Sequence, residues 1–116
     1  MKYFSHKIID DVMVIRFKFN EIDLQQRAEL KTDLNSIFDS NIHKYVLNMS
    51  KIGFFSSLVI ATIISFAKNV GEEIGKIKLC ELKSDAKYIV SITKLDKAFE
   101  IYDTEHDALQ SLSGDK

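Results

Sequence analysis

Two adjacent serines, Ser56 and Ser57, are the residues of this chain whose types and spacing best support chemistry. They follow an apolar, strand-like stretch that ends at Met49 and open a second apolar stretch that runs to Asn69. A serine at the start of a helix caps free backbone amides. The same amides, together with the positive end of the helix dipole, favour a bound phosphate. The pair is therefore either a helix cap or an acceptor of a phosphoryl group, and one serine can be both.

A phosphate on either serine would act as a binding switch. Phosphoserine carries about −1.5 to −2 charges, which the first-turn amides of a helix can accept locally. The same charge inside an apolar docking patch repels a partner and carries a desolvation cost. A hydroxyl at this position therefore suits the control of protein binding.

Other kinds of chemistry lack a pattern in this sequence. His6, His43 and His106 are far apart and have no Cys or carboxylate at metal-ligand spacing, so we expect no metal site. Glu72-Glu73 and the run 103–107 are typical of solvated helix ends rather than of an acid/base pair. The chain has neither a phosphate-binding glycine loop nor a GxSxG elbow around a serine. We therefore expect no enzyme activity and no cofactor.

Composition limits the class of protein further. The 16 basic and 17 acidic residues leave a formal charge of −1 and are interspersed, which argues against a nucleic-acid partner. The single cysteine, Cys80, lies in the apolar run KIKLCEL, so we expect a buried strand cysteine. A chain with one cysteine forms no internal disulfide, which is consistent with a reducing cytoplasm.

Length and hydropathy predict one domain that does not enter a membrane. The chain has 116 residues, no proline and four glycines, and 46% of its residues are hydrophobic. We expect a single domain over residues 1–112 and a short tail over residues 113–116. The N-terminal segment has no apolar core typical of a secretory signal. The stretch Phe54 to Ala67 is shorter than the about 20 residues that span a bilayer, so we interpret it as a core helix.

The first half of the chain predicts a hairpin, a helix and a strand. Residues 4–8 and 12–19 alternate like strands around Asp10-Asp11. Asp23 and Gln26 have capping-box spacing, which predicts a helix to about Ser40. Its apolar residues at spacings of four and three are Leu30, Leu34 and Ile37. Residues 44–49 form a short apolar strand.

The second half predicts three more helices that alternate with strands. Ser56 or Ser57 caps a helix that ends near residues 71–75, and residues 76–82 form a strand. Ser84 is expected to cap the next helix, and residues 99–102 are extended. Asp103 or Thr104 caps the last helix. The apolar residues of these two later helices are Ile89, Val90, Ile92, Ala108, Leu109 and Leu112.

The resulting order, β-β-α-β-α-β-α-β-α, predicts an α/β fold. Strands that alternate with helices of this length return by parallel crossovers, so we expect a mixed sheet with an N-terminal hairpin and helices packed on it. The helix over residues 58–66 is apolar on more than one face. Part of that helix is therefore expected to contact a partner protein or a second copy of the chain in a homodimer.

Three segments resemble one family, the STAS domains of sulfate transporters and anti-sigma-factor antagonists. VLNMSKIGFFSS at residues 46–57 resembles the family's apolar strand followed by Asp-Ser-Ser-Gly-Leu. Residues 19–38 are similar to the family's Gly-x-Leu-Asp segment and first helix, with Asn20 in the glycine place and Asp23 in the aspartate place. Residues 75–109 resemble its C-terminal half. The resemblance covers nearly the whole chain in the family's order.

The resemblance implies a cytoplasmic bacterial regulator of sigma-factor-dependent transcription. Such a protein binds an anti-sigma factor that is also a serine kinase, frees the sigma factor, and is inactivated when the kinase phosphorylates its serine. A phosphatase resets it. In an ungapped alignment Ser57 falls on the acceptor position and Ser56 on the preceding aspartate, whereas a shift by one residue makes Ser56 the acceptor. The residues expected around the partner are Asp23, Asn48, Ser50, Phe54, Phe55 and Leu58.

The chain also departs from the family's pattern. It has Ser56 in place of the aspartate and Val59 in place of the glycine, and Phe54-Phe55 makes the loop more apolar. The alternative hypothesis is therefore a diverged, unphosphorylated STAS module that docks or assembles without a kinase switch. A third and weaker hypothesis, binding of a lipid or small ligand, rests on the two phenylalanines alone.

Overall fold

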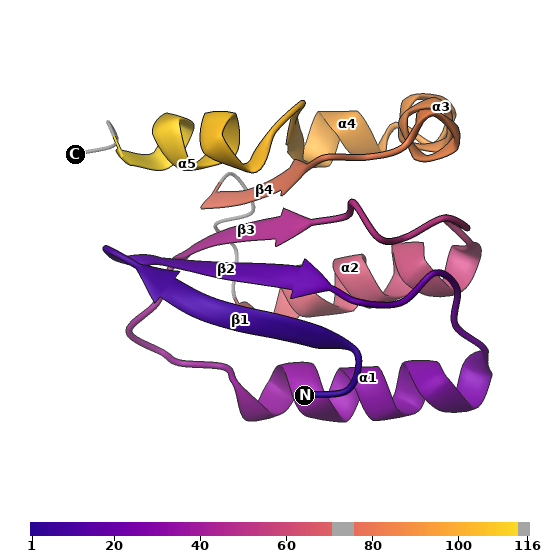
Figure 1. Ribbon diagram of the computed structural model, residues 1–116, viewed down its shortest axis with the longest axis horizontal. Coiled ribbons are helices and arrows are strands. Elements are labelled where there is room, and N and C mark those ends of the chain that lie inside the picture. Colours follow the sequence, from indigo (N-terminus) through magenta and orange to yellow (C-terminus); the bar gives the residue numbers. More distant parts are fainter. Residues whose placement is uncertain (71–75, 114–116) are drawn as a thin grey trace.

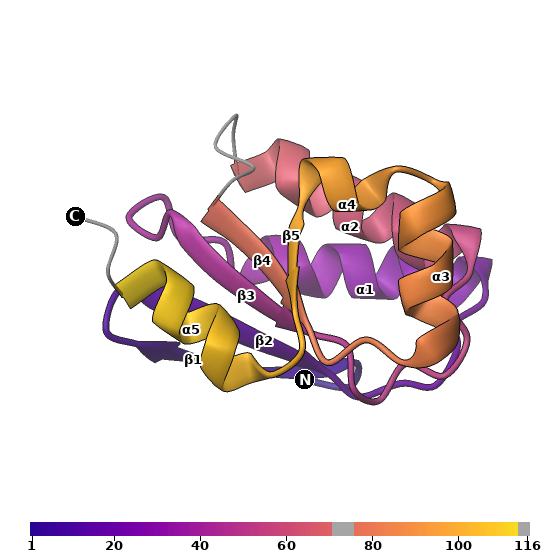
Figure 2. The same cartoon turned by 90° about the horizontal axis from the view of Figure 1, so that it is seen from above.

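The computed structural model describes residues 1–70 and 76–113, which form one mixed sheet with helices on both faces (Figures 1 and 2). The strands are β1 (Phe4–Ile9), β2 (Val12–Phe17), β3 (Lys44–Asn48), β4 (Ile77–Cys80) and β5 (Glu100–Tyr102). The helices are α1 (Leu24–Ser36), α2 (Ser57–Val70), α3 (Ser84–Ile92), α4 (Leu95–Ala98) and α5 (Glu105–Ser113).

The five strands lie side by side in the order in which they occur along the chain. β1 and β2 pair antiparallel, with Phe4 opposite Phe17, and the three later pairs are parallel. Asp10, in the hairpin turn, has φ of 56°, a left-handed conformation that aspartate adopts more readily than most residues. The predicted α/β fold, a mixed sheet with an N-terminal hairpin, is confirmed.

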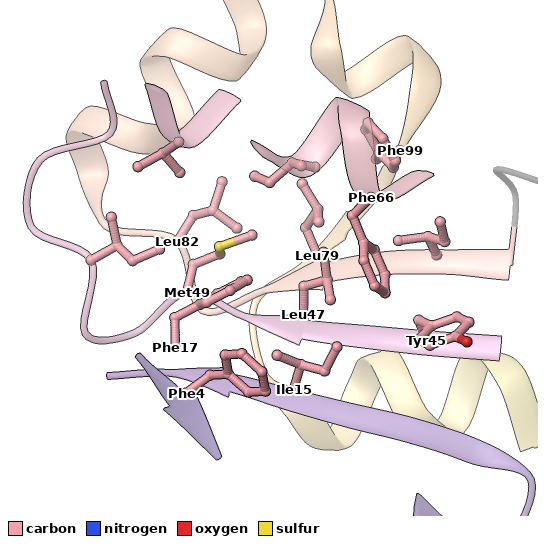
Figure 3. Close-up of a cluster of buried hydrophobic side chains, with 14 of the residues drawn as sticks. Phe4, Ile15, Phe17, Tyr45, Leu47, Met49, Phe66, Leu79, Leu82 and Phe99 are labelled. Carbon is pink, nitrogen blue, oxygen red and sulfur yellow. The ribbon is translucent and has the colours of Figure 1, made fainter. Parts of the chain in front are cut away.

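Alternation along the strands divides the apolar side chains between two cores. Tyr45 and Leu47 of β3 point into the larger core, which α1 and α2 cover, whereas Val46 points into a smaller core beneath α5. Figure 3 shows the larger core, where Phe4, Ile15, Phe17, Tyr45, Leu47, Met49, Phe66, Leu79, Leu82 and Phe99 gather. Burial of both sheet faces explains why β2 and β3 read as almost continuous apolar runs.

Helix α2 is apolar on more than one face because other parts of the same chain pack against more than one of its faces. Val59, Ile63 and Phe66 are buried in the larger core, and Leu58 and Ile60 pack partly buried against it. Helix α1 lies beside α2 as a second neighbour. The chain itself therefore covers much of the apolar surface that the sequence suggested for a partner or a second copy.

Several predicted boundaries were wrong. Helix α1 ends at Ser36 rather than near Ser40. Ser84 does not cap α3: the cap residue is Lys83, which makes no side-chain cap hydrogen bond, and Ser84 is the first helical residue. A short helix that the sequence pattern did not predict, α4, follows Lys94, which has a left-handed φ of 64°. The expected end of the second helix, residues 71–75, lies outside the described residues.

The predictions of the capping box, of the cap of the last helix and of a buried Cys80 are confirmed. The capping box at Asp23 and Gln26 is formed. Thr104 is the cap of α5, because its Oγ1 accepts a hydrogen bond of 3.0 Å from the Asp107 N–H. Cys80 is a free, buried cysteine, and burial raises its pKa to about 12. Within the described residues, no helix is both long enough and apolar enough to span a bilayer.

The larger core predicts unequal effects for two leucines. Leu79, on the inner strand β4, is completely buried, whereas Leu24, the first residue of α1, is 70% exposed. We expect Leu79→Ala to lower the free energy of unfolding by about 2–5 kcal/mol, because it leaves a cavity. The matched change Leu24→Ala is expected to stay within about 0.5 kcal/mol of wild type. Urea denaturation measures both values, and equal losses would contradict this assignment of the core.

Candidate functional site

The candidate site lies at the edge of the sheet where the parallel strands end. The chain leaves β2, β3 and β4 at this edge, on the right of Figure 1, and the N-terminal ends of α1 and α2 lie there too. The centre of the site is the loop between β3 and α2, residues 49–56, which we call the switch loop. In α/β sheets, ligands and partners commonly bind at this edge.

Backbone hydrogen bonds fix the path of the switch loop. The N–H groups of Gly53 and Phe54 both donate to the backbone oxygen of Asn20, each over 3.0 Å. Asn20 follows β2, so the loop after β2 supports the loop after β3. Ile52 and Phe55 point inward and are buried. The loop is therefore held both by its backbone and by its apolar side chains.

Gly53 leaves room for the side chain of Asn20. A Cβ at this position would lie 2.0 Å from the Asn20 Oδ1 atom, which is far inside van der Waals contact. The interpretation of the sequence missed this role of Gly53. The available signal was a glycine between two apolar stretches in a chain that has only four glycines.

The structure gives the two serines different positions. Ser56 is the cap of α2: its Oγ accepts from the Val59 N–H over 3.4 Å, and its backbone oxygen accepts from Ile60 over 3.1 Å. Ser57 is the first residue of α2 and is exposed, whereas Ser56 is half-buried. The cap and the accessible hydroxyl are therefore on different residues.

Asp23 serves the start of α1. Its Oδ1 accepts a hydrogen bond of 2.8 Å from the Gln26 N–H, and the Gln26 Oε1 accepts one of 2.9 Å from the Asp23 N–H. Further along α1, Arg27 Nε donates to Thr62 Oγ1 of α2 over 3.3 Å. These contacts fix the start of α1 beside α2, and with it one border of the site.

Asn48 and Ser50 belong to a polar network behind the switch loop. The Asn48 Oδ1 accepts from the Ser50 N–H over 2.9 Å, and the Asn48 Nδ2 donates to Glu105 Oε1, also over 2.9 Å. Arg16 donates twice to the same carboxylate, through Nε over 2.8 Å and Nη2 over 2.6 Å. Asn48 is buried, so it supports the loop from inside rather than facing a partner.

The sequence interpretation did not include Arg16 or Glu105. They are 89 residues apart, and no local pattern joins them. One signal was present: Arg16 interrupts the apolar run of β2, and a charge within such a strand needs a partner. The hydrogen bond from Arg16 is the largest cause that lowers the pKa of Glu105, and it outweighs the opposing effect of desolvation. The same hydrogen bond raises the pKa of Arg16.

The outer surface of the site includes exposed apolar side chains. Phe54 is 59% exposed in the switch loop, and Leu24 is exposed at the start of α1. Leu58 is half-buried on the first turn of α2. Phe55 is only 3% exposed, so Phe54 is the aromatic ring that the loop presents to solvent. Ser57 therefore precedes the half-buried Leu58 and follows the exposed Phe54 by three residues.

Among residues 1–70 and 76–113, no group of three or more His, Cys, Asp or Glu side chains is placed to hold a metal ion. The two carboxylates nearest the network, Glu81 and Glu105, are both engaged in hydrogen bonds. What the site offers is an exposed hydroxyl at the start of α2, directly after a loop that hydrogen bonds hold in place.

Comparison with known proteins identifies the family. The STAS domain model matches residues 3–108, and the chain belongs to this family. It is 26% identical over 94 residues to the anti-sigma-F factor antagonist RsfB of Mycobacterium tuberculosis, covering 81% of this chain and 76% of RsfB. The crystal structure of TM1081 from Thermotoga maritima has 25% identity and a TM-score of 0.77 over 93% of this chain and 92% of that one.

A third similar structure is the anti-sigma factor antagonist SpoIIAA. Its unphosphorylated form has 17% identity and a TM-score of 0.71 over 96% of this chain and 98% of SpoIIAA. The phosphorylated form of SpoIIAA from Bacillus has a TM-score of 0.68 and 16% identity over 94% of this chain and 98% of that one. At these identities the likeness to SpoIIAA is one of fold.

The ion pair of Arg16 and Glu105 predicts a pH dependence of stability. Because the folded state lowers the pKa of Glu105, the ionised carboxylate stabilises the fold, and this contribution is lost as the pH falls through the lowered value. We expect Glu105→Gln to be less stable than wild type at pH 7, with a difference that shrinks as the pH falls below the ordinary value of 4.5.

Urea denaturation over a pH series measures this difference. Glu100→Gln is the matched control, because Glu100 also has a lowered pKa through Lys78, but its side chain is 63% exposed. Solvent screening weakens that pair, so its pH-dependent difference should be smaller. A difference between wild type and Glu105→Gln that stays constant with pH would contradict the prediction.

Proposed function

We propose that this protein is an anti-sigma-factor antagonist that docks through the switch loop and the first turn of α2. In this proposal it binds a cytoplasmic anti-sigma factor, and this binding frees the sigma factor. Phosphorylation of Ser57 by a serine kinase, the anti-sigma factor itself, weakens the binding, and a phosphatase restores it. The proposal is supported by membership of the STAS family and by the similarity to RsfB, which is named as an anti-sigma-F factor antagonist.

One observation carries the proposal of a switch: Ser57 is exposed at the first position of α2 while Ser56 makes the cap. A kinase needs an accessible hydroxyl, and a cap needs a hydroxyl turned toward the helix. Since separate residues meet the two needs, modification of Ser57 leaves the cap in place. Ser56 remains the second candidate acceptor, but it is half-buried.

The surroundings of Ser57 suit a phosphate. The first turn of α2 contains no acidic residue, so no nearby carboxylate on the helix repels the added charge. The free amides of that turn attract it. Phe54 provides the adjacent apolar surface, into which a charge of about −1.5 to −2 would bring a desolvation cost when a partner docks. The helix thus attracts the same phosphate group that would interfere with docking.

The two departures from the family pattern have different consequences for the proposed docking and for the proposed kinase switch. Val59, in the place of the family's glycine, points into the core and is buried, so it does not obstruct the docking surface. Ser56, in the place of the aspartate, removes a carboxylate beside the acceptor. This second change favours the alternative function, a docking or assembly module without a kinase switch. In that alternative, self-association through α2 would rely on Ile64, the large apolar residue that α2 exposes within the described part of the chain.

A pair of substitutions at Ser57 separates the two functions. We expect Ser57→Ala to keep binding of the anti-sigma factor and Ser57→Asp to weaken it about tenfold or more, because the charge enters an apolar contact. The wild-type protein is first used to capture the anti-sigma factor from native cells. The dissociation constants of the variants are then measured with that anti-sigma factor. Ser84→Asp is the matched control, since Ser84 is exposed at the first position of α3. Equal affinities of the Ala and Asp variants at Ser57 would contradict the switch and favour the docking module.

A second comparison tests the docking surface. Phe54 and Phe38 are both exposed phenylalanines, but Phe38 follows the C-terminal end of α1, away from the switch loop. We expect Phe54→Ala to weaken binding of the same anti-sigma factor by about 2 kcal/mol, the size typical of an aromatic anchor. Phe38→Ala should leave the affinity within twofold of wild type, which is a change in binding free energy of at most ~0.4 kcal/mol. Loss of affinity with Phe38→Ala alone would place the partner on another surface.

A further inference from the structure

The Glu105 carboxylate determines how the Asn48 amide is oriented. A carboxylate only accepts hydrogen bonds, so the Asn48 side chain must turn its NH2 group toward Glu105. The distance from Asn48 Nδ2 to Glu105 Oε1 is 2.9 Å. This orientation leaves the Asn48 Oδ1 as the atom that faces the switch loop, where it accepts from the Ser50 N–H. The negative charge of Glu105 therefore makes Asn48 present an acceptor, rather than a donor, to the Ser50 N–H.

Glu105 is itself held from two sides. The guanidinium of Arg16, at the end of β2, binds both carboxylate oxygens, and the side chain of Glu105 is only 15% exposed. The backbone N–H of Glu105 donates to Glu81 Oε2 over 2.9 Å. Glu81 follows β4 directly and has a left-handed φ of 59°. The first residue of α5 is thus tied to the ends of three neighbouring strands, β2, β3 and β4.

We propose that Glu105 is a positioning residue for the switch loop: it orients Asn48, and Asn48 fixes Ser50 at the start of the segment that carries Phe54 and Ser57. The loop then has a side-chain anchor at its first turn and the Asn20 backbone oxygen at its middle. The N-terminus of α5, on the opposite face of the sheet from α2, is in this way part of the docking site. The consequence for binding rests on the proposed function, whereas the positioning does not.

Amide hydrogen exchange of the chain alone tests the positioning. The Ser50 N–H is compared with the N–H of Val46, an amide of the central strand β3, in wild type, Glu105→Ala and Glu105→Gln. We expect Glu105→Ala to speed exchange at Ser50 at least about tenfold more than at Val46. Without Glu105 the Asn48 side chain can rotate, and its hydrogen bond from the Ser50 N–H is lost. Glu105→Gln should give an intermediate rate, because its amide oxygen still accepts from Asn48.

Glu100→Ala is the matched control. Glu100 accepts from Lys78 Nζ over 2.7 Å, and the Lys78 side chain is 9% exposed, so this variant also removes a carboxylate from an ion pair on the sheet. It does not touch the switch loop. In this variant the exchange at Val46, whose register partner is Lys78, should therefore speed up at least as much as the exchange at Ser50.

Equal factors at Ser50 and Val46 in both Glu105 variants would overturn the proposal and leave Glu105 with a purely global role. Should Glu105→Ala fail to fold, the Glu105→Gln result decides alone, with a preferential loss at Ser50 supporting the proposal and a uniform loss contradicting it. Neither result depends on a partner or on phosphorylation. An unphosphorylated Ser57 would therefore count against the proposed function without changing the outcome at Ser50.

Discussion

The proposed docking site depends on one constraint: a loop without secondary structure of its own must hold a fixed path at the end of the sheet. Residues 49–56 meet this constraint through the backbone oxygen of Asn20, which accepts from two consecutive loop amides. Gly53, one of the two donors, also leaves room for the Asn20 side chain, which a Cβ at position 53 would displace. Without this anchor the cap at Ser56 and the exposed position of Ser57 would not be fixed relative to Phe54.

The architecture of the sheet supplies the anchor. Because β2, β3 and β4 are parallel, their ends meet at one edge, and residues distant in the sequence become neighbours there. The loop after β2 supports the loop after β3, and the first residue of α5 closes the polar network behind them. Both sheet faces contribute, since α1 and α2 border the docking surface while Glu105 reaches Asn48 from the face that α5 covers. The fold thus places the exposed Ser57 directly after a loop that the buried Asn48, Ile52 and Phe55 hold in position.

Much of this arrangement follows from local sequence patterns, and the rest depends on contacts between distant residues. Alternation around Asp10-Asp11 and the capping box at Asp23 predicted elements that the structure confirms, because their causes lie within a few residues. Ser84 has the residue type of a cap, but the chain enters α3 one residue earlier than that role requires. The network of Arg16 and Glu105 joins the two ends of the chain, so no local spacing could predict it.

Phosphorylation at one of two adjacent serines is the central claim, and tandem mass spectrometry of the protein purified from its native cells tests it most directly. The fragments that span Lys51 to Lys68 separate Ser56 from Ser57. An added mass of about 80 Da, one HPO3 unit, on Ser57 with Ser56 unmodified is the predicted result. A phosphate on Ser56, or no phosphate under growth and stress conditions alike, would contradict the claim that Ser57 is the switch.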